Sequence, residues 1–272
     1  MALKIKTISI IGGTGKIGSV FASAFKEKGY DVIVSSRKSE IKPIDATARG
    51  DLVIVSVPIG VTEEVIKEIG NYVRKDSVLM DFTSVKTGPC KMMKKFSKSK
   101  IIGGHPLFGP GVAIKGESIV LCKVRGETSE LKRLFEEIGL KVIEMSAEEH
   151  DKEMAIIQCA NQFSNIGFGS YLVKERFDLG NKLLTPAMKL KLSVVGRTLS
   201  QNPELYPEIL LHNPYAKKAI NQYIKSLKEL NEVVKKGDEK ELVSKIEELK
   251  KYFGDSSEKA RELTNKILNE DI

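Results

Sequence analysis

The sequence predicts an α/β N-terminal domain with a doubly wound sheet, followed by an all-helical domain. Short β-branched runs alternate with amphipathic helical patterns as far as residue 146, which is typical of strands and helices wound around a parallel sheet. A glycine cluster joins the first run to the first helical pattern. From residue 147 onward there is helical periodicity and no convincing strand. We therefore place the first domain at residues 1–147 and the second at residues 148–272.

Length and composition fit a globular protein with two ordinary domains. The 272 residues are 41% hydrophobic, which is enough to fill two cores. No apolar run approaches the roughly 18 residues that span a membrane. The first strand pattern also begins too early for a signal peptide. We therefore expect a cytoplasmic protein with no membrane partner.

The charged, thiol and imidazole side chains indicate neither nucleic acid nor metal. The net charge is +8, but lysines and glutamates are interleaved in the last third of the chain, as on solvated helix faces. We therefore expect no nucleic-acid partner. Cys90, Cys122 and Cys159 lie far apart in the sequence, which favours buried thiols over disulfides or metal ligands. The histidines are equally scattered, so no metal site is predicted.

The glycine cluster between the first strand and the first helix indicates a dinucleotide site. Gly13, Gly15 and Gly18 match the pattern G-x-G-x-x-G. The first glycine permits a tight turn, the second lets the backbone approach a pyrophosphate, and the third lets the helix pack closely on the strand. An ordinary glycine-rich turn explains the turn but not this register. We expect a Rossmann-like domain whose cofactor contacts here are Gly13, Thr14, Gly15, Lys16, Ile17 and Gly18.

The end of the second predicted strand, at residues 30–35, favours NADP over NAD. An acidic residue at this position normally accepts a hydrogen bond from the ribose 2′-hydroxyl. Here the chain instead continues with Ser36, Arg37 and Lys38. A hydroxyl and a guanidinium suit a 2′-phosphate, which a carboxylate would repel. The alternative is that Arg37 and Lys38 are surface cations of a loop and that NAD is bound as well.

The remaining elements continue this alternation. The run at 51–58 is nearly all apolar, as expected of a strand buried on both faces. Further strands are expected at 77–81, 100–103, 118–122 and 141–145, and helices at 61–72, 91–96 and 129–138. In the second domain, Thr185-Pro186 predicts a helix start. Asn213-Pro214 and Gly237-Asp238 predict breaks between later helices.

The carboxyl ends of the predicted strands carry the candidate chemistry, because these ends line the ligand crevice of such sheets. Val57 and Pro58 end the third strand, and Thr83 follows the fourth. We expect all three at the cofactor. Ser84 and His105 should reach the same crevice.

His105 is the candidate general base. It follows the predicted strand at 100–103, in a segment with four glycines and two prolines. We expect a loop there, and a rigid loop at a strand end suits a fixed base. The Ser84 hydroxyl can hydrogen-bond one imidazole nitrogen and so set its tautomer. A single histidine is more often structural, so its position alone leaves both interpretations open.

An ordered series of motifs resembles the prephenate dehydrogenase family along nearly the whole chain. Its elements include Val-Ser-Val-Pro58, Asp-Phe-Thr-Ser-Val-Lys86, Gly-His-Pro-Leu-Phe-Gly-Pro110, Glu-His-Asp151 and Val-Gly-Arg197 followed by Asn-Pro-Glu-Leu-Tyr206. The resemblance implies oxidative decarboxylation of prephenate to 4-hydroxyphenylpyruvate in tyrosine biosynthesis. It also implies NAD(P) as cofactor and a homodimer formed through the helical domain.

The resemblance also assigns roles to individual residues. In that family the histidine of the His-Pro segment accepts a hydrogen bond from the ring hydroxyl of the substrate, which corresponds to His105, and the serine before Val-Lys corresponds to Ser84. The arginine that holds a substrate carboxylate corresponds to Arg197, and Tyr206 is expected at the substrate as well. Gln162 stands where some members carry a further active-site histidine. That departure leaves prephenate and arogenate open as substrates.

Other interpretations remain at this point. We expect His150, near the start of a helix, to be structural, and His212 to be a surface or capping residue. The chain can also be another two-domain NADP oxidoreductase of the β-hydroxyacid type, although neither Lys152 nor Lys174 is well placed as its acid. A third alternative is a non-catalytic NADP-sensing protein, because fold alone does not establish catalysis.

Overall fold

A computed structural model describes residues 5–269 and divides into two compact units. The first unit runs as far as Ala155 and includes the later segment Pro207–Tyr215, whereas the second comprises Ile156–Tyr206 and the chain from Ala216 onward. The sequence places the boundary at 147/148. The boundary lies later because helix α6 (Ala147–Met154) packs on elements of the first unit, α4 and β6.

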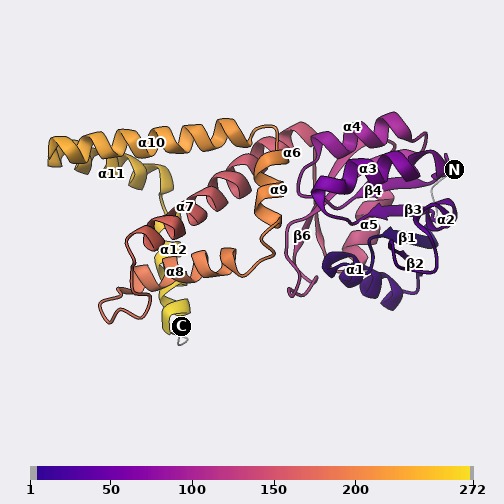
Figure 1. Cartoon of the computed structure of the whole chain (residues 1–272), viewed down its shortest axis with the longest axis horizontal. Coiled ribbons are helices and arrows are strands. Elements are labelled where there is room, and N and C mark those ends of the chain that lie inside the picture. The colour runs from indigo at the N-terminus through magenta and orange to yellow at the C-terminus, as the bar shows by residue number, and fades with distance from the viewer. Residues whose placement is uncertain (1–4, 270–272) are drawn as a thin grey trace. The chain divides into compact units, whose positions relative to one another are not determined.

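The first unit contains a seven-stranded sheet, counted over residues 5–269, in the order β2-β1-β3-β4-β5-β6-β7 (Figure 1). All neighbouring strands are parallel except β5 and β6, which pair antiparallel. The doubly wound α/β domain is confirmed, with an antiparallel step near one edge. The strands are β1 (Thr7–Ile11), β2 (Asp31–Ser35), β3 (Leu52–Val55), β4 (Val78–Asp81), β5 (Lys100–Pro106), β6 (Ser118–Arg125) and β7 (Lys141–Met145).

Helices cover both faces of this sheet. Phe21 and Phe25 of α1 (Lys16–Glu27) and Phe135 of α5 (Ser129–Glu137) belong to the core cluster on one face. The opposite cluster takes Ala46 from α2, Ile66 from α3 and Met93 from α4. The bounds on that face are α2 (Pro43–Arg49), α3 (Ile59–Ile69), the 3-10 turn η1 (Gly70–Tyr72) and α4 (Thr87–Phe96). Every residue of β3 and β4 is buried, as expected of strands covered on both sides.

Strand β5 is longer than the sequence predicts. It runs past Gly103 to Pro106, and His105 pairs with Val120 of β6. The expectation that His105 lies in a loop is therefore wrong. The antiparallel partner supplies ladder contacts that a parallel α/β pattern would not provide at this position.

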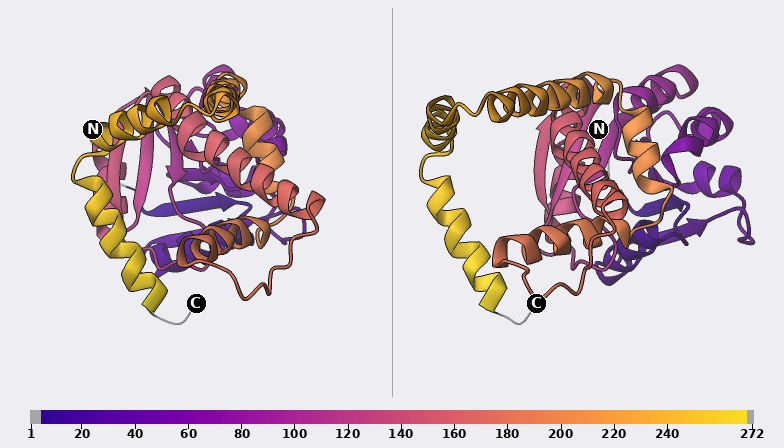
Figure 2. Two further views of the ribbon diagram at one scale, coloured as in Figure 1. Left: turned by 90° about the vertical axis from the view of Figure 1, so that its left-hand side faces the viewer. Right: turned by 60° about the vertical axis from the view of Figure 1, so that its left-hand side comes forward.

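The second unit is helical throughout the part that the structure describes. It begins with a π-helical segment, η2 (Ala155–Ala160), which leads into α7 (Asn161–Lys174). Helix α7 packs against α8, α10 against α11, and α12 lies beside α8 and α11 (Figure 2). The predicted helix start is present, with the Thr185 hydroxyl accepting a hydrogen bond from Met188 N at 3.3 Å. The other helices of this unit are α8 (Pro186–Leu199), α10 (Ala216–Lys236), α11 (Glu239–Phe253) and α12 (Ser256–Asn269), whereas α9 (Leu205–His212) lies mostly in the later segment of the first unit.

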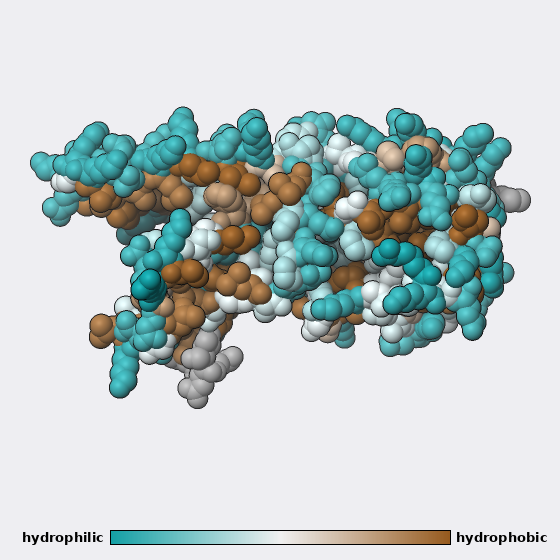
Figure 3. Space-filling model, in the orientation of Figure 1, coloured by the Kyte–Doolittle hydropathy of each residue, from teal (hydrophilic) through white to brown (hydrophobic). Residues whose placement is uncertain are grey.

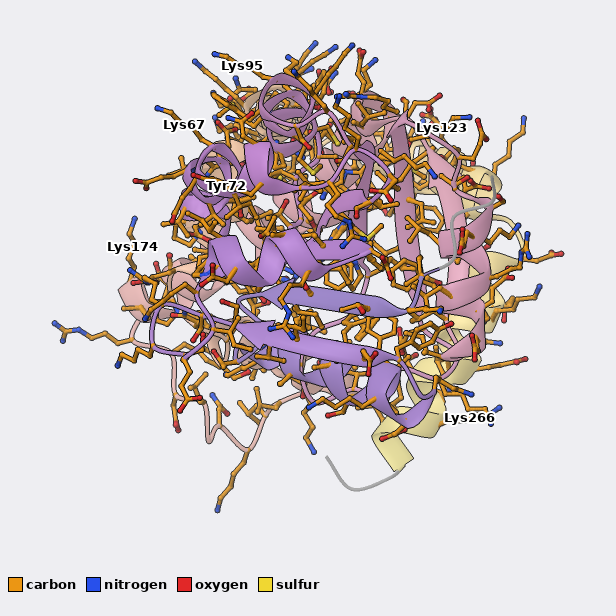
Figure 4. The ribbon with its side chains drawn as sticks, turned by 90° about the vertical axis from the view of Figure 1, so that its right-hand side faces the viewer. Lys67, Tyr72, Lys95, Lys123, Lys174 and Lys266 are labelled. Carbon is orange, nitrogen blue, oxygen red and sulfur yellow. The ribbon has the colours of Figure 1, made fainter. Side chains whose placement is uncertain are left out.

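Both apolar and basic side chains are exposed on the surface. Large hydrophobic side chains are exposed on the helices of the second unit, where brown patches cover part of the surface in Figure 3. On the first unit, Lys67, Lys95 and Lys123 project outward (Figure 4). Within residues 5–269, no helix combines the length and apolarity needed to cross a membrane. Nor does that range contain a group of three or more His, Cys, Asp or Glu side chains suited to a metal ion.

Candidate active site

A cavity of about 400 Å³ lies at the carboxyl ends of β1, β2 and β3. Strands β1 and β3 are neighbours in the sheet although β2 lies between them in the sequence. The cavity is therefore at the switch point where open α/β sheets bind ligands. Among the residues that line it are Thr14, Gly15, Ser36, Arg37, Val57 and Pro58.

The glycine loop forms the floor of this cavity, but its tight turn is one residue earlier than the motif predicts. Gly12 has a φ of +85°, and a Cβ there would lie 2.2 Å from the Ser56 carbonyl oxygen. Only glycine fits this position, so the turn depends on Gly12 rather than Gly13. A Cβ on Gly18 would lie 2.7 Å from the Gly12 carbonyl oxygen, consistent with close packing of α1 on the loop.

The N-terminus of α1 fits a dinucleotide pyrophosphate. Gly15 is the N-cap residue, and no side chain caps the helix. Within residues 5–269, the backbone N–H groups of Lys16, Ile17 and Gly18 have no hydrogen-bond acceptor. Unpaired N–H groups at a helix start bind phosphate oxygens. The pyrophosphate oxygens of a bound NAD(P) would thus accept hydrogen bonds from these N–H groups.

The end of β2 bears on which dinucleotide binds. Arg37 is exposed, has no ion-pair partner among the described residues, and lines the cavity together with Ser36. No acidic side chain follows β2 directly. Glu64 and Glu68 of α3 line the same cavity.

The side chain of Thr83, which the sequence predicts at the cofactor, is hydrogen-bonded within the protein. It is only 4% exposed, and its hydroxyl lies 2.5 Å from Asp81 Oδ2. Asp81 also forms a fully buried ion pair with Lys86, whose Nζ donates to the Gly104 carbonyl oxygen at 2.6 Å. Thr83 thus belongs to an internal polar network that reaches the carbonyl of Gly104, the residue before His105 in β5.

His105 belongs to a chain of three buried side chains. Its Nδ1 lies 2.8 Å from His150 Nε2, and His150 Nδ1 lies 2.8 Å from Asp151 Oδ1. Asp151 is held in turn by backbone N–H groups of Lys86 at 2.7 Å and Thr87 at 2.8 Å. The two imidazole rings meet edge to face, at an interplanar angle of 76°.

This chain corrects two expectations. His150, expected to be only structural, contacts the candidate base. Ser84, expected to set the tautomer of His105, is half-buried and has no hydrogen-bond partner among the described residues. The sequence signal for this contact is weak: a capping box of Ser146 and Glu149 starts α6, which puts His150 and Asp151 at its beginning without indicating what they contact.

The charge of Asp151 determines the direction of every hydrogen bond in this chain. A carboxylate only accepts, so the proton of neutral His150 must be on Nδ1. His150 Nε2 is then an acceptor, and His105 must donate to it from Nδ1. His105 Nε2 is consequently left as an acceptor with no partner among the described residues.

Burial sets the protonation states on which this assignment depends. Burial lowers the pKa of His105 well below its usual range, and the neighbouring His150 and Lys86 lower it further. Burial also lowers the pKa of His150, although the hydrogen bond to Asp151 opposes that shift. For Asp151, burial raises the pKa, but hydrogen bonds from His150, Thr87 and Lys86 outweigh it and the net shift is downward. Both imidazoles are therefore neutral and the carboxyl group is ionised near pH 7.

The helical unit brings together a second group of predicted site residues. The Thr198 hydroxyl lies 3.1 Å from Gln162 Oε1 and 3.1 Å from the Val194 carbonyl oxygen, so its one proton serves one of these acceptors at a time. Thr198 also hydrogen-bonds Tyr206, whose pKa is raised by burial and lowered less strongly by the nearby charge of Arg197. Arg197 is exposed and forms no ion pair with any described residue. Thr198 joins these side chains, and the sequence analysis did not single it out.

Comparison with known proteins identifies the family. A family model for the nucleotide-binding domain of prephenate dehydrogenase matches residues 21–144, and one for its dimerization domain matches residues 146–248. The chain belongs to the prephenate dehydrogenase family. This is a family of oxidoreductases with an NAD(P)-binding domain.

Individual relatives agree with this assignment. The chain is 35% identical to a probable arogenate/prephenate dehydrogenase of Methanocaldococcus jannaschii, covering 96% of this chain but 64% of the relative. It is 30% identical to the T-protein of Haemophilus influenzae, covering 98% of this chain and 72% of that protein. A crystal structure of prephenate dehydrogenase from Aquifex aeolicus, in complex with hydroxyphenyl propionate and NAD+, shares the fold with a TM-score of 0.72 at 22% identity, covering 92% and 98% of the two chains.

Proposed function

We propose that this protein catalyses the NAD(P)-dependent oxidative decarboxylation of prephenate to 4-hydroxyphenylpyruvate. The observation that carries this proposal is the series of hydrogen bonds from Asp151 through His150 to His105, which leaves His105 Nε2 as a buried acceptor with no partner among the described residues. Such a nitrogen suits a substrate that must give up a hydroxyl proton. Family membership favours this reaction over a β-hydroxyacid dehydrogenase, for which we found no well-placed acid.

The residues of the chain account for the proton in this reaction. The dinucleotide, when bound, supplies the nicotinamide ring that takes a hydride from the ring carbon bearing the hydroxyl. His105 accepts the hydrogen bond of that hydroxyl and draws its proton as the hydride leaves. The bond between the ring and its carboxylate breaks, and carbon dioxide departs. The electron pair of that bond stays with the ring, which becomes aromatic. The proton returns from His105 to the phenol oxygen of the product.

Substrate binding is assigned to Arg197, Gln162 and Tyr206, with Ser84 near the hydroxyl. An exposed guanidinium without an ion-pair partner can bind a carboxylate through two hydrogen bonds. When the Thr198 hydroxyl donates to Gln162 Oε1 rather than to the equally distant Val194 carbonyl oxygen, the NH₂ group of Gln162 is what remains for a ligand. A donor suits the carbonyl oxygen of the prephenate side chain and disfavours the ammonium group of arogenate. We therefore propose prephenate rather than arogenate as the preferred substrate.

The cofactor proposal is NADP in preference to NAD. Support comes from Ser36 and Arg37 at the cavity and from the missing carboxylate after β2. A 2′-phosphate would give Arg37 the partner that it lacks. The pyrophosphate contact is proposed for the free N–H groups of Lys16, Ile17 and Gly18 and for the loop from Gly13 to Gly15.

We also propose that the protein is a homodimer formed through its helical unit and acts in the cytoplasm without a nucleic-acid partner. The dimerization-domain match, residues 146–248, includes most of that unit but not α12. Leu227, Leu230 and Val234 of α10 and Ile246 and Leu249 of α11 are 43–60% exposed, and a second copy would remove them from water. Sedimentation at several protein concentrations should give twice the mass of the chain.

The deciding experiment compares four substrate pairs. Initial rates are measured by reduced-nicotinamide absorbance with prephenate or arogenate, each with NAD or NADP. We expect the highest kcat/KM for prephenate with NADP. Absence of turnover with all four pairs, together with measurable NADP binding, would favour the sensing protein instead.

A further inference from the structure

We propose that His150 and Asp151 position the base of this reaction by holding His105 in the tautomer whose Nε2 accepts a proton. This role rests on the proposed function for the identity of the hydroxyl, but the tautomer itself rests only on the hydrogen-bonded chain. His150 acts through His105 and is therefore a positioning residue rather than a catalytic one.

The geometry gives His105 one arrangement of protons. The Asp151 carboxylate is fixed by two backbone N–H groups at the start of α4 and accepts from His150. His150 can then only accept from His105. Without His150, nothing among the described residues would distinguish the two ring nitrogens of His105. A His105 ring with its proton on Nε2 could not accept the hydroxyl proton of the substrate at that nitrogen.

The same chain stabilises His105 after it takes the proton. The imidazolium keeps its Nδ1–H donated to His150 Nε2, and the negative charge of Asp151 lies beyond that ring. On the other side, the positive charge of Lys86 is paired with Asp81. The charged groups around the two imidazoles are thus one buried ion pair and one carboxylate. Burial, His150 and Lys86 oppose a positive charge on His105, and the carboxylate of Asp151 offsets part of that opposition while the proton is held.

Two replacements of His150 separate positioning from packing. Glutamine has an amide oxygen that can accept from His105 Nδ1 and an NH₂ group that can donate to Asp151, so His150→Gln can preserve the tautomer. His150→Phe retains a ring but neither hydrogen bond. Asp151 is unsuitable for this test because its carboxylate also caps α4. His212 is exposed and does not belong to the hydrogen-bonded series of His105, His150 and Asp151. His212→Gln and His212→Phe are therefore matched controls.

We expect His150→Phe to lose about 10²- to 10⁴-fold in kcat, the range of general-base assistance, while KM for NADP stays close to the wild-type value. His150→Gln should recover most of that loss, and both His212 variants should resemble the wild type. A purely structural role predicts instead that kcat follows the melting temperature in all four variants. Equal losses in His150→Gln and His150→Phe would overturn the proposal.

A measurement that needs no activity tests the tautomer directly. The sequence has only three histidines, so ¹⁵N-histidine NMR with His150 and His212 variants assigns each ring. Near pH 7, His105 should carry its proton on Nδ1. A proton on Nε2 would overturn the positioning role even if the enzyme is active. The expected tautomer without turnover of prephenate or arogenate would instead support the positioning of His105 and refute the proposed reaction.

Discussion

The two groups of side chains assigned to the substrate differ in how firmly the protein holds them. His105 is 3% exposed and hydrogen-bonded through His150 to a carboxylate that is itself held by backbone N–H groups. Arg197 is exposed and has no ion-pair partner among the described residues. A base must meet one proton in one direction, whereas a carboxylate can be bound by an adjustable guanidinium. We therefore expect His105 variants to change turnover and Arg197 variants to change substrate affinity.

The largest effect is expected for His105→Asn, which removes the proton acceptor. Turnover should fall about 10²- to 10⁴-fold, because general-base assistance contributes roughly that much. NADP affinity, measured by fluorescence titration, should be retained. If kcat at saturating substrate is unchanged, His105 is a structural residue and the buried group does not perform the chemistry.

A smaller effect, on binding, is expected for Arg197→Lys. The charge remains but the planar fork is lost. A hydrogen bond to a charged group contributes roughly 1.5–3 kcal/mol, so KM for prephenate should rise about ten- to a hundredfold. The KM for NADP should stay unchanged. Arg176→Lys, another exposed arginine of the helical unit, is the control. An unchanged KM in both Arg197→Lys and Arg197→Ala would place the carboxylate elsewhere.

Arg37→Asp should change the choice of cofactor by about tenfold, because a 2′-phosphate loses a charge-assisted partner and meets a carboxylate. The ratio of kcat/KM for NADP to that for NAD should fall. Lys38→Asp is the neighbouring control and should have a weaker effect. Equal losses for both cofactors would mean that Arg37 supports the loop rather than the phosphate.

The smallest expected effect concerns pH. Burial, with His150 and Lys86, lowers the pKa of His105, so the acid limb of kcat should have its midpoint below the ordinary histidine value of about 6.5. As pH falls below this ordinary value of about 6.5, His105 binds a proton in the unfolded chain but not in the folded one, so the free energy of unfolding should decrease. An acid limb at or above the ordinary value would show that His105 is not held neutral.

Much of the helical group was predictable from motif resemblance, and much of the buried group was not. Arg197, Gln162 and Tyr206 were all named from the sequence, and Thr198 was missed because a lone threonine inside a helix carries no distinguishing pattern. His105 was named too, but its strand and its partner were not. Its antiparallel neighbour β6 and its contact with His150 are long-range, and neither leaves a periodic signal near residue 105.

The sequence by itself determined the fold class, the glycine loop and the lack of a carboxylate after β2, because periodicity and motif spacing are local properties of the chain. Only the folded chain shows that Gly12 makes the tight turn, because the atom that excludes a side chain there is the carbonyl oxygen of Ser56, the residue directly after β3. The tertiary structure also decided which nitrogen of His105 is free. Residues 105 and 150 meet only when α6 packs on the sheet unit, and the direction of a hydrogen bond depends on such a contact rather than on sequence.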